Sequence, residues 1–232
     1  EGITVSVGGE IGEVGKENSN EAELRAYMDN FNEDLAKINP NYKGISKISI
    51  QTGTSHGGVP LPDGSVAEVQ LDFETLENLS RISREDYHLA GAVQHGASTL
   101  PSDLFHKFPE LETAEIHLAT NFQNMIYDST HFPADFKQEI YTYLRKACAD
   151  EKKDDMTDEQ FIYKTRKKGF GPFRPQFWDL PEEVKTEIGK ELEGEFNFLF
   201  NKLNAQNTTQ FVREAGTPHP IAPSLENEIQ HG

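Results

Sequence analysis

Short runs with strand character alternate with stretches of helical periodicity along 4–120, and this alternation constrains the fold more than any other feature. The strand-like runs cover 4–7, 45–50, 89–94 and 114–120, and each ends in glycine or polar residues. Apolar residues between them follow helical spacing over about 21–38, 71–82 and 101–108, and Asn20 can cap the first of these helices. Strands that alternate with helices in this way favour parallel βαβ units.

The polar strand ends are the expected place for a site. Active sites of (β/α)₈ barrels lie at the carboxyl ends of the strands. Doubly wound sheets follow a similar rule, so the alternation alone leaves both α/β folds open.

The chain changes character after residue 121. Helical patterns cover 121–129, 134–150 and 181–205, with a charged linker at 151–158 and an aromatic-rich segment within 159–180. We therefore expect a strand-helix part over 1–150 and a helical extension over 151–232, with a loose tail at 214–232. The aromatic cluster at 170–178 is interpreted as packing or subunit contact rather than a ligand site.

Composition excludes several classes of function. The net charge of −17 opposes binding to nucleic acids and to anionic membranes, because both need clustered Lys and Arg. Cys148 is the only cysteine, so no disulfide forms within the chain. No apolar run approaches a membrane span and the first residues lack a signal-peptide pattern, so we expect a cytoplasmic protein.

Two histidines stand out at the ends of consecutive strands. His56 and His95 are each followed by glycine, which lets backbone and substrate approach closely. Imidazole nitrogen with carboxylate oxygen is a ligand set typical of catalytic zinc. Spacing alone does not decide whether the two share a metal. The histidines at 88, 106, 131 and 219 are interpreted as structural or merely exposed.

Four segments together resemble one known family. They read Glu-Ile-Gly-Glu-Val-Gly-Lys-Glu at 10–17, Gly-Thr-Ser-His-Gly at 53–57, Gln-His-Gly-Ala-Ser at 94–98 and His-Leu-Ala-Thr-Asn at 117–121. In this order they are similar to the motifs of class II fructose- and tagatose-bisphosphate aldolases. The helical stretch 71–76 is similar to a connecting helix of that family. The resemblance covers 4–123.

The resemblance implies a (β/α)₈ barrel, of which this chain holds the last four β/α units plus a helical extension. It implies a metal-dependent lyase of carbohydrate metabolism such as glycolysis. This enzyme would cleave or form the C3–C4 bond of a ketose (bis)phosphate, giving dihydroxyacetone phosphate and an aldehyde. The implied cofactor is Zn²⁺ or another divalent metal, with a monovalent cation as a further candidate. The implied assembly is a homo-oligomer.

The resemblance also assigns roles to residues. His56, His95 and Glu10 would bind the metal, and Glu17 would be the proton-transferring carboxylate of a mobile loop. The residues implied for substrate and phosphate binding are Gly57, Gly96, Ser98, His117, Thr120 and Asn121. The ordinary alternatives are that Ser98 and Thr120 cap the next helix and that Glu17 is an exposed loop acid.

The sequence departs from the family at three positions. His117 stands where the family has a substrate-contacting Asn, Asn18 follows Glu17 where the family shows paired glutamates, and Lys16 replaces a glycine. These changes leave open which substrate is used and whether catalysis is retained.

The rival hypothesis is an aldolase-like barrel with a binding, sensing or assembly role. A third is another sugar-phosphate lyase or isomerase.

The family's first four strands have no counterpart in the sequence. In the family they carry a further metal-binding His and an acid/base Asp. A four-stranded half would expose two sheet edges. We therefore expect a missing N-terminal barrel half, on a precursor of this chain or on a companion chain. The alternative is that two half-barrels pair.

Overall fold

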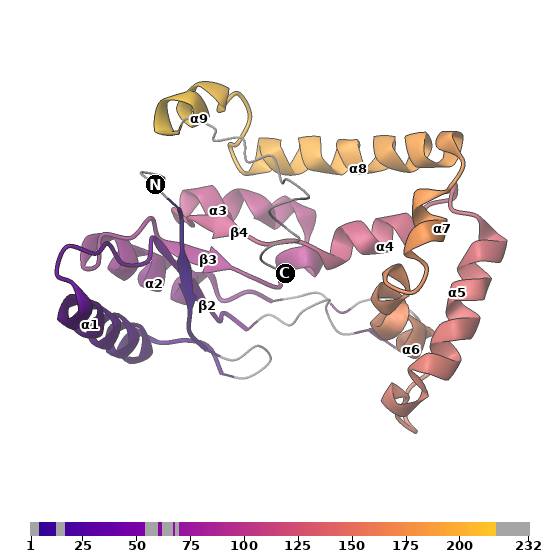
Figure 1. Cartoon of the computed structure of the whole chain (residues 1–232), viewed down its shortest axis with the longest axis horizontal. Helices are drawn as coiled ribbons and strands as arrows, with labels where there is room; N and C mark the ends of the chain where they lie inside the picture. Colours follow the sequence, from indigo (N-terminus) through magenta and orange to yellow (C-terminus); the bar gives the residue numbers. More distant parts are fainter. Residues whose placement is uncertain (1–4, 13–16, 54–59, 62–66, 68–69, 217–232) are drawn as a thin grey trace, which may run out of the picture.

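A parallel four-stranded sheet forms the first part of the molecule. The computed structural model describes residues 5–12, 17–53, 60–61, 67 and 70–216. Its strands are β1 (Gly8–Glu10), β2 (Lys47–Ile50), β3 (Ala92–Gln94) and β4 (Glu115–Ile116), in the order β1-β2-β3-β4. The register pairs Glu10 with Ser49, Ile50 with Gln94, and Gln94 with Ile116. All four strands therefore end at the same edge of the sheet (Figure 1).

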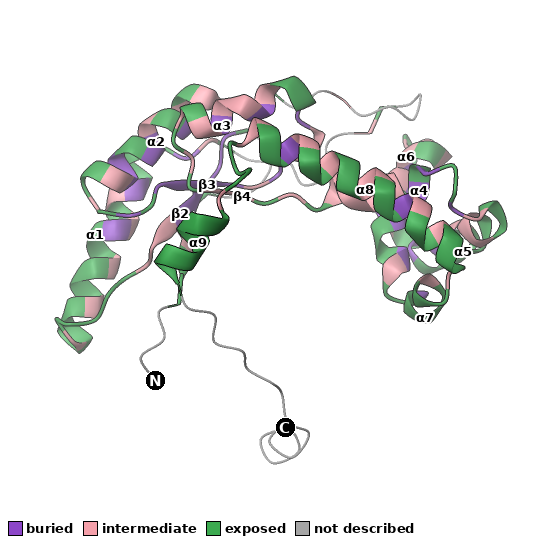
Figure 2. Ribbon diagram, turned by 90° about the horizontal axis from the view of Figure 1, so that it is seen from above, coloured by how far each residue is buried: buried purple, intermediate pink, exposed green. Residues whose placement is uncertain are grey.

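Helices cover one face of this sheet. They are α1 (Glu21–Ile38), α2 (Phe73–Glu85) and α3 (Lys107–Glu110), with the 3₁₀ helices η1 (Ala97–Thr99) and η2 (Ser102–His106) between β3 and α3. Buried residues mark one side of α1 and α2 (Figure 2). They pack against alternate strand residues in a first hydrophobic core, which includes Leu24, Met28, Ile48, Ile50, Leu76, Leu79, Ile82 and Ala92.

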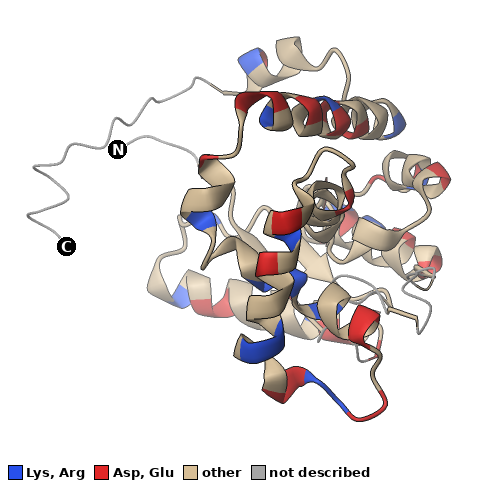
Figure 3. Cartoon of the chain, turned by 90° about the vertical axis from the view of Figure 1, so that its right-hand side faces the viewer, with Lys and Arg blue, Asp and Glu red and all other residues tan. Residues whose placement is uncertain are grey.

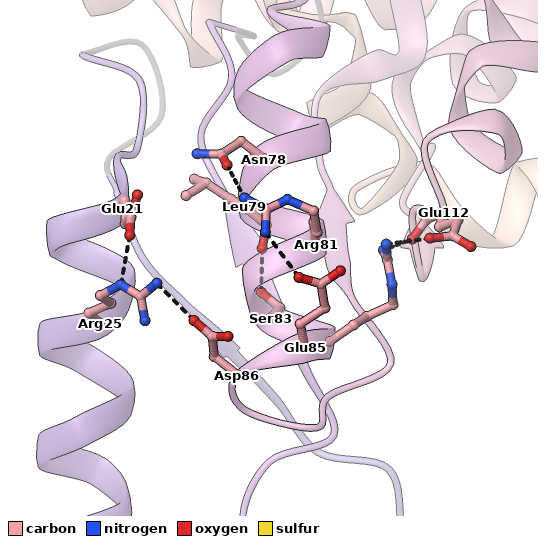
Figure 4. Close-up of polar contacts among 10 residues, drawn as sticks. Glu21, Arg25, Asn78, Leu79, Arg81, Ser83, Glu85, Asp86 and Glu112 are labelled. Carbon is pink, nitrogen blue, oxygen red and sulfur yellow. Dashed lines mark hydrogen bonds and ion pairs between the residues drawn. The ribbon is translucent and has the colours of Figure 1, made fainter.

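Side-chain caps fix where the two long helices begin. Asn20 forms a capping box with Glu23, and α1 has the predicted bounds. The second helix begins at Phe73 rather than at 71, because the Asp72 side chain accepts the Thr75 N–H at 3.0 Å. Arg25 then joins the helices, since its guanidinium contacts both Glu21 and Asp86 at 2.8 Å (Figure 4).

The strands are shorter than the sequence pattern predicted. The fourth strand was expected to reach 120, but β4 ends at Ile116 and Thr120 already begins α4 (Thr120–Asp128). Directly after β4 the His117 N–H donates to the Gln94 carbonyl at 2.9 Å, and further along the Ala119 N–H donates to the Ser98 hydroxyl at 3.2 Å.

A second hydrophobic core lies beyond the sheet. Its elements are α4, α5 (Ala134–Ala147), η3 (Ala149–Glu151), α6 (Asp158–Thr165), η4 (Arg166–Phe170) and α7 (Arg174–Trp178). Tyr127, Phe132, Ile140 and Phe161 are buried in it, and Phe170 and Phe177 stack there at 4.6 Å between ring centroids. The aromatic segment thus packs, as expected, although Trp178 is 68% exposed.

One long helix connects the two cores. After α7, α8 (Glu182–Lys202) runs back toward the sheet and is followed by α9 (Thr209–Ala215) (Figure 1). Ile188 is buried in the second core, whereas Leu199 is buried in the first. Acidic residues recur along α8 (Figure 3). The division of the chain at residue 150 stays a prediction.

None of the helices that the structure describes combines the length and the apolarity needed to cross a lipid bilayer.

Candidate functional site

The candidate side chains gather on the sheet face opposite the helix-covered core. Side chains alternate between faces along a strand. Ile48 and Ala92 pair in register and belong to the helix-covered core, so Ser49 and Val93 point the other way. Glu10 pairs with Ser49, and Glu115 pairs with Val93. The alternation therefore places Glu10 and Glu115 on the face opposite the helix-covered core.

Glu10, His95 and His117 meet at the carboxyl ends of β1, β3 and β4. The Nδ1 atom of His95 lies 3.9 Å from a carboxylate oxygen of Glu10. The rings of His95 and His117 stack with centroids 4.4 Å apart. The sequence motifs predicted Glu10 and His95 as neighbours, and the structure brings them together. It adds His117 as a direct contact of His95.

The predicted third ligand is not among the residues that the structure describes. His56 and its neighbour Gly57 both lie in the segment 54–59, outside the described residues. No cluster of three His, Cys, Asp or Glu side chains suited to a metal occurs within the described part of the chain. His95 and Glu10 supply one nitrogen and one oxygen donor, and this donor chemistry fits zinc once a further imidazole is added.

Buried polar residues hold the backbone beneath His95. Gln94 is fully buried, accepts the Thr52 hydroxyl at 2.8 Å and donates to the His95 carbonyl at 2.5 Å. Gly96 has φ of 73°, in the left-handed region that favours glycine. Sequence reasoning passed over Thr52 and Gln94 as positioning residues. The sequence feature that could have indicated Gln94 is its polar amide at the end of an otherwise apolar strand.

A cavity of about 390 Å³ opens beside His95 and His117. Its lining includes Gly96, Ser98 and Thr120, three of the residues predicted to bind phosphate, together with Gln123 and Lys167, which were not predicted. Neither Ser98 nor Thr120 caps the helix that follows it, because Ser98 lies within η1, Pro101 is the cap residue of η2 and Ala119 is that of α4. The Ser98 hydroxyl instead accepts the Ala119 N–H. Asn121 lines a neighbouring cavity and donates to Glu195 at 3.4 Å.

The loop after β1 shows what the unusual Asn18 does. Its amide donates to the Asp72 carboxylate at 2.8 Å, which ties the loop to the start of α2. Glu17 is exposed beside it, and 13–16 lie outside the described residues. Asn18 thus makes a structural contact, and the carboxylate of Glu17 is accessible.

A lysine and a histidine share one carboxylate next to the site. The Glu115 carboxylate contacts both the Lys47 ammonium and the His117 ring. The hydrogen bond from Lys47, and then the one from His117, hold the pKa of Glu115 below its usual range. Glu115 therefore remains an acceptor that orients the His117 ring.

Comparison with known protein families matches most of the chain. The family model described as fructose-bisphosphate aldolase class-II matches residues 1–167, which include β1 to β4, α1 to α6 and the first residues of η4. A search of the curated proteins found no match.

Proposed function

The chain belongs to the class II fructose-bisphosphate aldolase family, and from this we propose that it is a metal-dependent aldolase acting on a ketose bisphosphate. Its parallel sheet and helices are part of a (β/α)₈ barrel. The proposed reaction cleaves the C3–C4 bond and gives dihydroxyacetone phosphate and an aldehyde. The observation that carries the proposal is the meeting of Glu10 and His95 at strand ends, beside a cavity lined by hydroxyl groups.

We propose that His56, His95 and Glu10 hold Zn²⁺ or another divalent metal. Such a metal, when bound, supplies Lewis-acid stabilisation of the charge that develops on the substrate oxygens. The buried Gln94 supports this role for His95, because its hydrogen bonds fix the backbone from which the imidazole projects. A fixed orientation of the imidazole favours metal binding, because the ligand then needs little reorganisation when the metal binds.

The remaining residues bind substrate and move a proton. Gly96, Ser98 and Thr120, with Gly57, would bind the ketose phosphate through N–H and hydroxyl groups. His117 is held by Glu115 against His95 and would contact the substrate where relatives carry an amide. Glu17, exposed on its loop, would transfer the proton.

Metal analysis tests the site. The natural full-length protein is expected to contain about one tightly bound divalent metal per chain, and the double variant His56→Ala/His95→Ala is expected to lose it. The exposed His131 lies outside the site, so His131→Ala is the matched control and should keep the metal. Metal retained in the double variant would show that the site is elsewhere.

Measurements of turnover distinguish the proposed aldolase activity from the alternative functions. Cleavage of fructose 1,6- and tagatose 1,6-bisphosphate should be measurable, and Glu17→Gln should slow it by about 10²- to 10⁴-fold with metal content unchanged. A metal-loaded protein that cleaves neither sugar favours the rival role in binding, sensing or assembly. Activity on other sugar phosphates in a substrate screen would favour a related lyase or isomerase.

We further propose that four more strands complete the barrel. In the described sheet, β1 and β4 each have one strand neighbour, whereas the strands of a closed barrel have two. The completing half would come from a precursor of this chain or from a companion chain. We propose that the assembled enzyme is a homo-oligomer. We also propose that it is cytoplasmic, because a chain with a single cysteine suits a reducing compartment.

A further inference from the structure

Lys167 reaches the cavity at the ends of β3 and β4 from a distant part of the chain. It lies on η4 and lines the cavity together with His95, Ser98, Thr120 and Gln123. Among the described residues that line this cavity, Lys167 is the one with a permanent charge, and none is a carboxylate. The whole chain carries a net charge of −17, and two other cavities in its described part have carboxylates in their linings, so a cavity lined by a cation and no described acid differs from them.

Neighbouring contacts set the direction of Lys167. Arg166 is 8% exposed, and its guanidinium donates to the Asp128 carboxylate at 2.6 and 2.9 Å. On the other side, the Lys168 ammonium pairs with Glu151. Successive side chains of a 3₁₀ helix point about 120° apart. Both neighbours are therefore anchored elsewhere, whereas Lys167 is exposed, lines the cavity and has no ion-pair partner within the described structure.

The lining has the chemistry of a phosphate site. Ser98 and Thr120 offer hydroxyl groups, Gln123 offers an amide, and the N-terminus of α4 begins at Thr120 in the same wall. Phosphate is bound by N–H and O–H donors together with a cation, and lysine supplies that cation as a point charge. Lys167 would repel a cationic ligand, and it would bind an anionic oxygen more strongly than a neutral one.

We propose that Lys167 binds a phosphate group of the substrate in this cavity and thereby sets the preference for phosphorylated over unphosphorylated ketoses. The proposal rests on the proposed function, and it adds a residue from outside the strand-helix units to the substrate site. Lys167 is a binding residue here, with no part in proton transfer.

Phosphate binding tests this independently of catalysis. Inorganic phosphate is titrated into the full-length protein and followed by ³¹P NMR. Lys167→Gln should weaken binding about tenfold or more, and Lys167→Arg should restore most of it. Lys164→Gln removes the same charge from an exposed position outside the cavity and should bind as the wild type does. Equal phosphate affinity in the wild type and in Lys167→Gln overturns the proposal.

Kinetics separate this proposal from the function on which it rests. For a ketose bisphosphate, Lys167→Gln should raise KM about tenfold with kcat nearly unchanged, the pattern of lost uniform binding. If the wild type cleaves no ketose phosphate but binds phosphate through Lys167, the proposed function fails and the binding site stands. If the wild type is active and Lys167→Gln keeps its KM, Lys167 has no such role.

Discussion

At the scale of single residues, short polar side chains decide both where elements begin and how site residues are held. Asn18 illustrates this. It stands where the resembling family has a glutamate, and in the structure its amide donates to the carboxylate of Asp72, the cap residue of α2. A change that looks like a lost catalytic acid in the sequence therefore has a local structural use. Gln94 acts similarly beneath His95.

The Asp72 cap predicts a loss of stability when it is removed. Asp72→Ala should lower the free energy of unfolding by about 1 kcal/mol at pH 7, because the Thr75 N–H loses its acceptor. Urea denaturation measures the change. Glu77→Ala, at an exposed position within α2, is the control and should stay within about 0.5 kcal/mol of the wild type. Equal stability of the two variants would contradict a capping role.

The same carboxylate predicts a pH dependence. Hydrogen bonds from the Thr75 N–H, the Thr75 hydroxyl and the Asn18 amide hold the pKa of Asp72 below its ordinary value. A lowered folded-state pKa contributes stability that is fully present above the unfolded value of about 3.9 and is lost as pH falls through the lower folded value. The stability gap between wild type and Asp72→Asn should therefore be constant near neutral pH and shrink below about pH 4.

At the scale of elements, close packing fixes how η4 sits on its neighbours. A Cβ added at Gly169 would lie 2.6 Å from the Ile140 Cγ2 atom and 2.7 Å from the Tyr127 hydroxyl. Both partners are fully buried, so neither can move aside at low cost. The backbone of η4 must therefore approach α4 and α5 closely, and this approach also places Lys167 at its cavity.

A pair of glycine substitutions tests that packing. Gly169→Ala should reduce the free energy of unfolding by about 1–3 kcal/mol through overpacking. Gly171→Ala is the matched control, because no atom lies within 4 Å of its added Cβ and its φ of −68° suits alanine. It should be neutral or stabilise by up to about 1 kcal/mol. Thermal or urea unfolding that shows equal effects for the two would contradict the packing.

At the scale of the whole molecule, a closed barrel predicts a larger natural assembly. The chain has a mass of 26.1 kDa. If four further strands complete the sheet, intact mass spectrometry of the natural protein should show a longer chain or a co-purifying companion. Native mass spectrometry separates the alternative, in which two copies of a 26.1 kDa chain pair their half-barrels. A 26.1 kDa monomer that binds metal and cleaves substrate would contradict closure.

Local features of the sequence determined the order of the strands and helices, the start of α1 at Asn20 and the family motifs around Glu10 and His95. These follow from periodicity, capping and residue type, all of which act between near neighbours in the chain. The ends of the strands were predicted less well. Ladder hydrogen bonds depend on a partner strand, and β4 has one only along Glu115 and Ile116.

Only the tertiary structure decided which side chains meet. Parallel register and the alternation of faces bring His117 against His95, and the path of the chain through α4 to η4 brings Lys167 to the same cavity. No spacing rule connects such positions, because their distance depends on how complete elements pack. The sequence motifs could therefore predict that Glu10 and His95 are neighbours, whereas the position of Lys167 at the cavity required the packed fold.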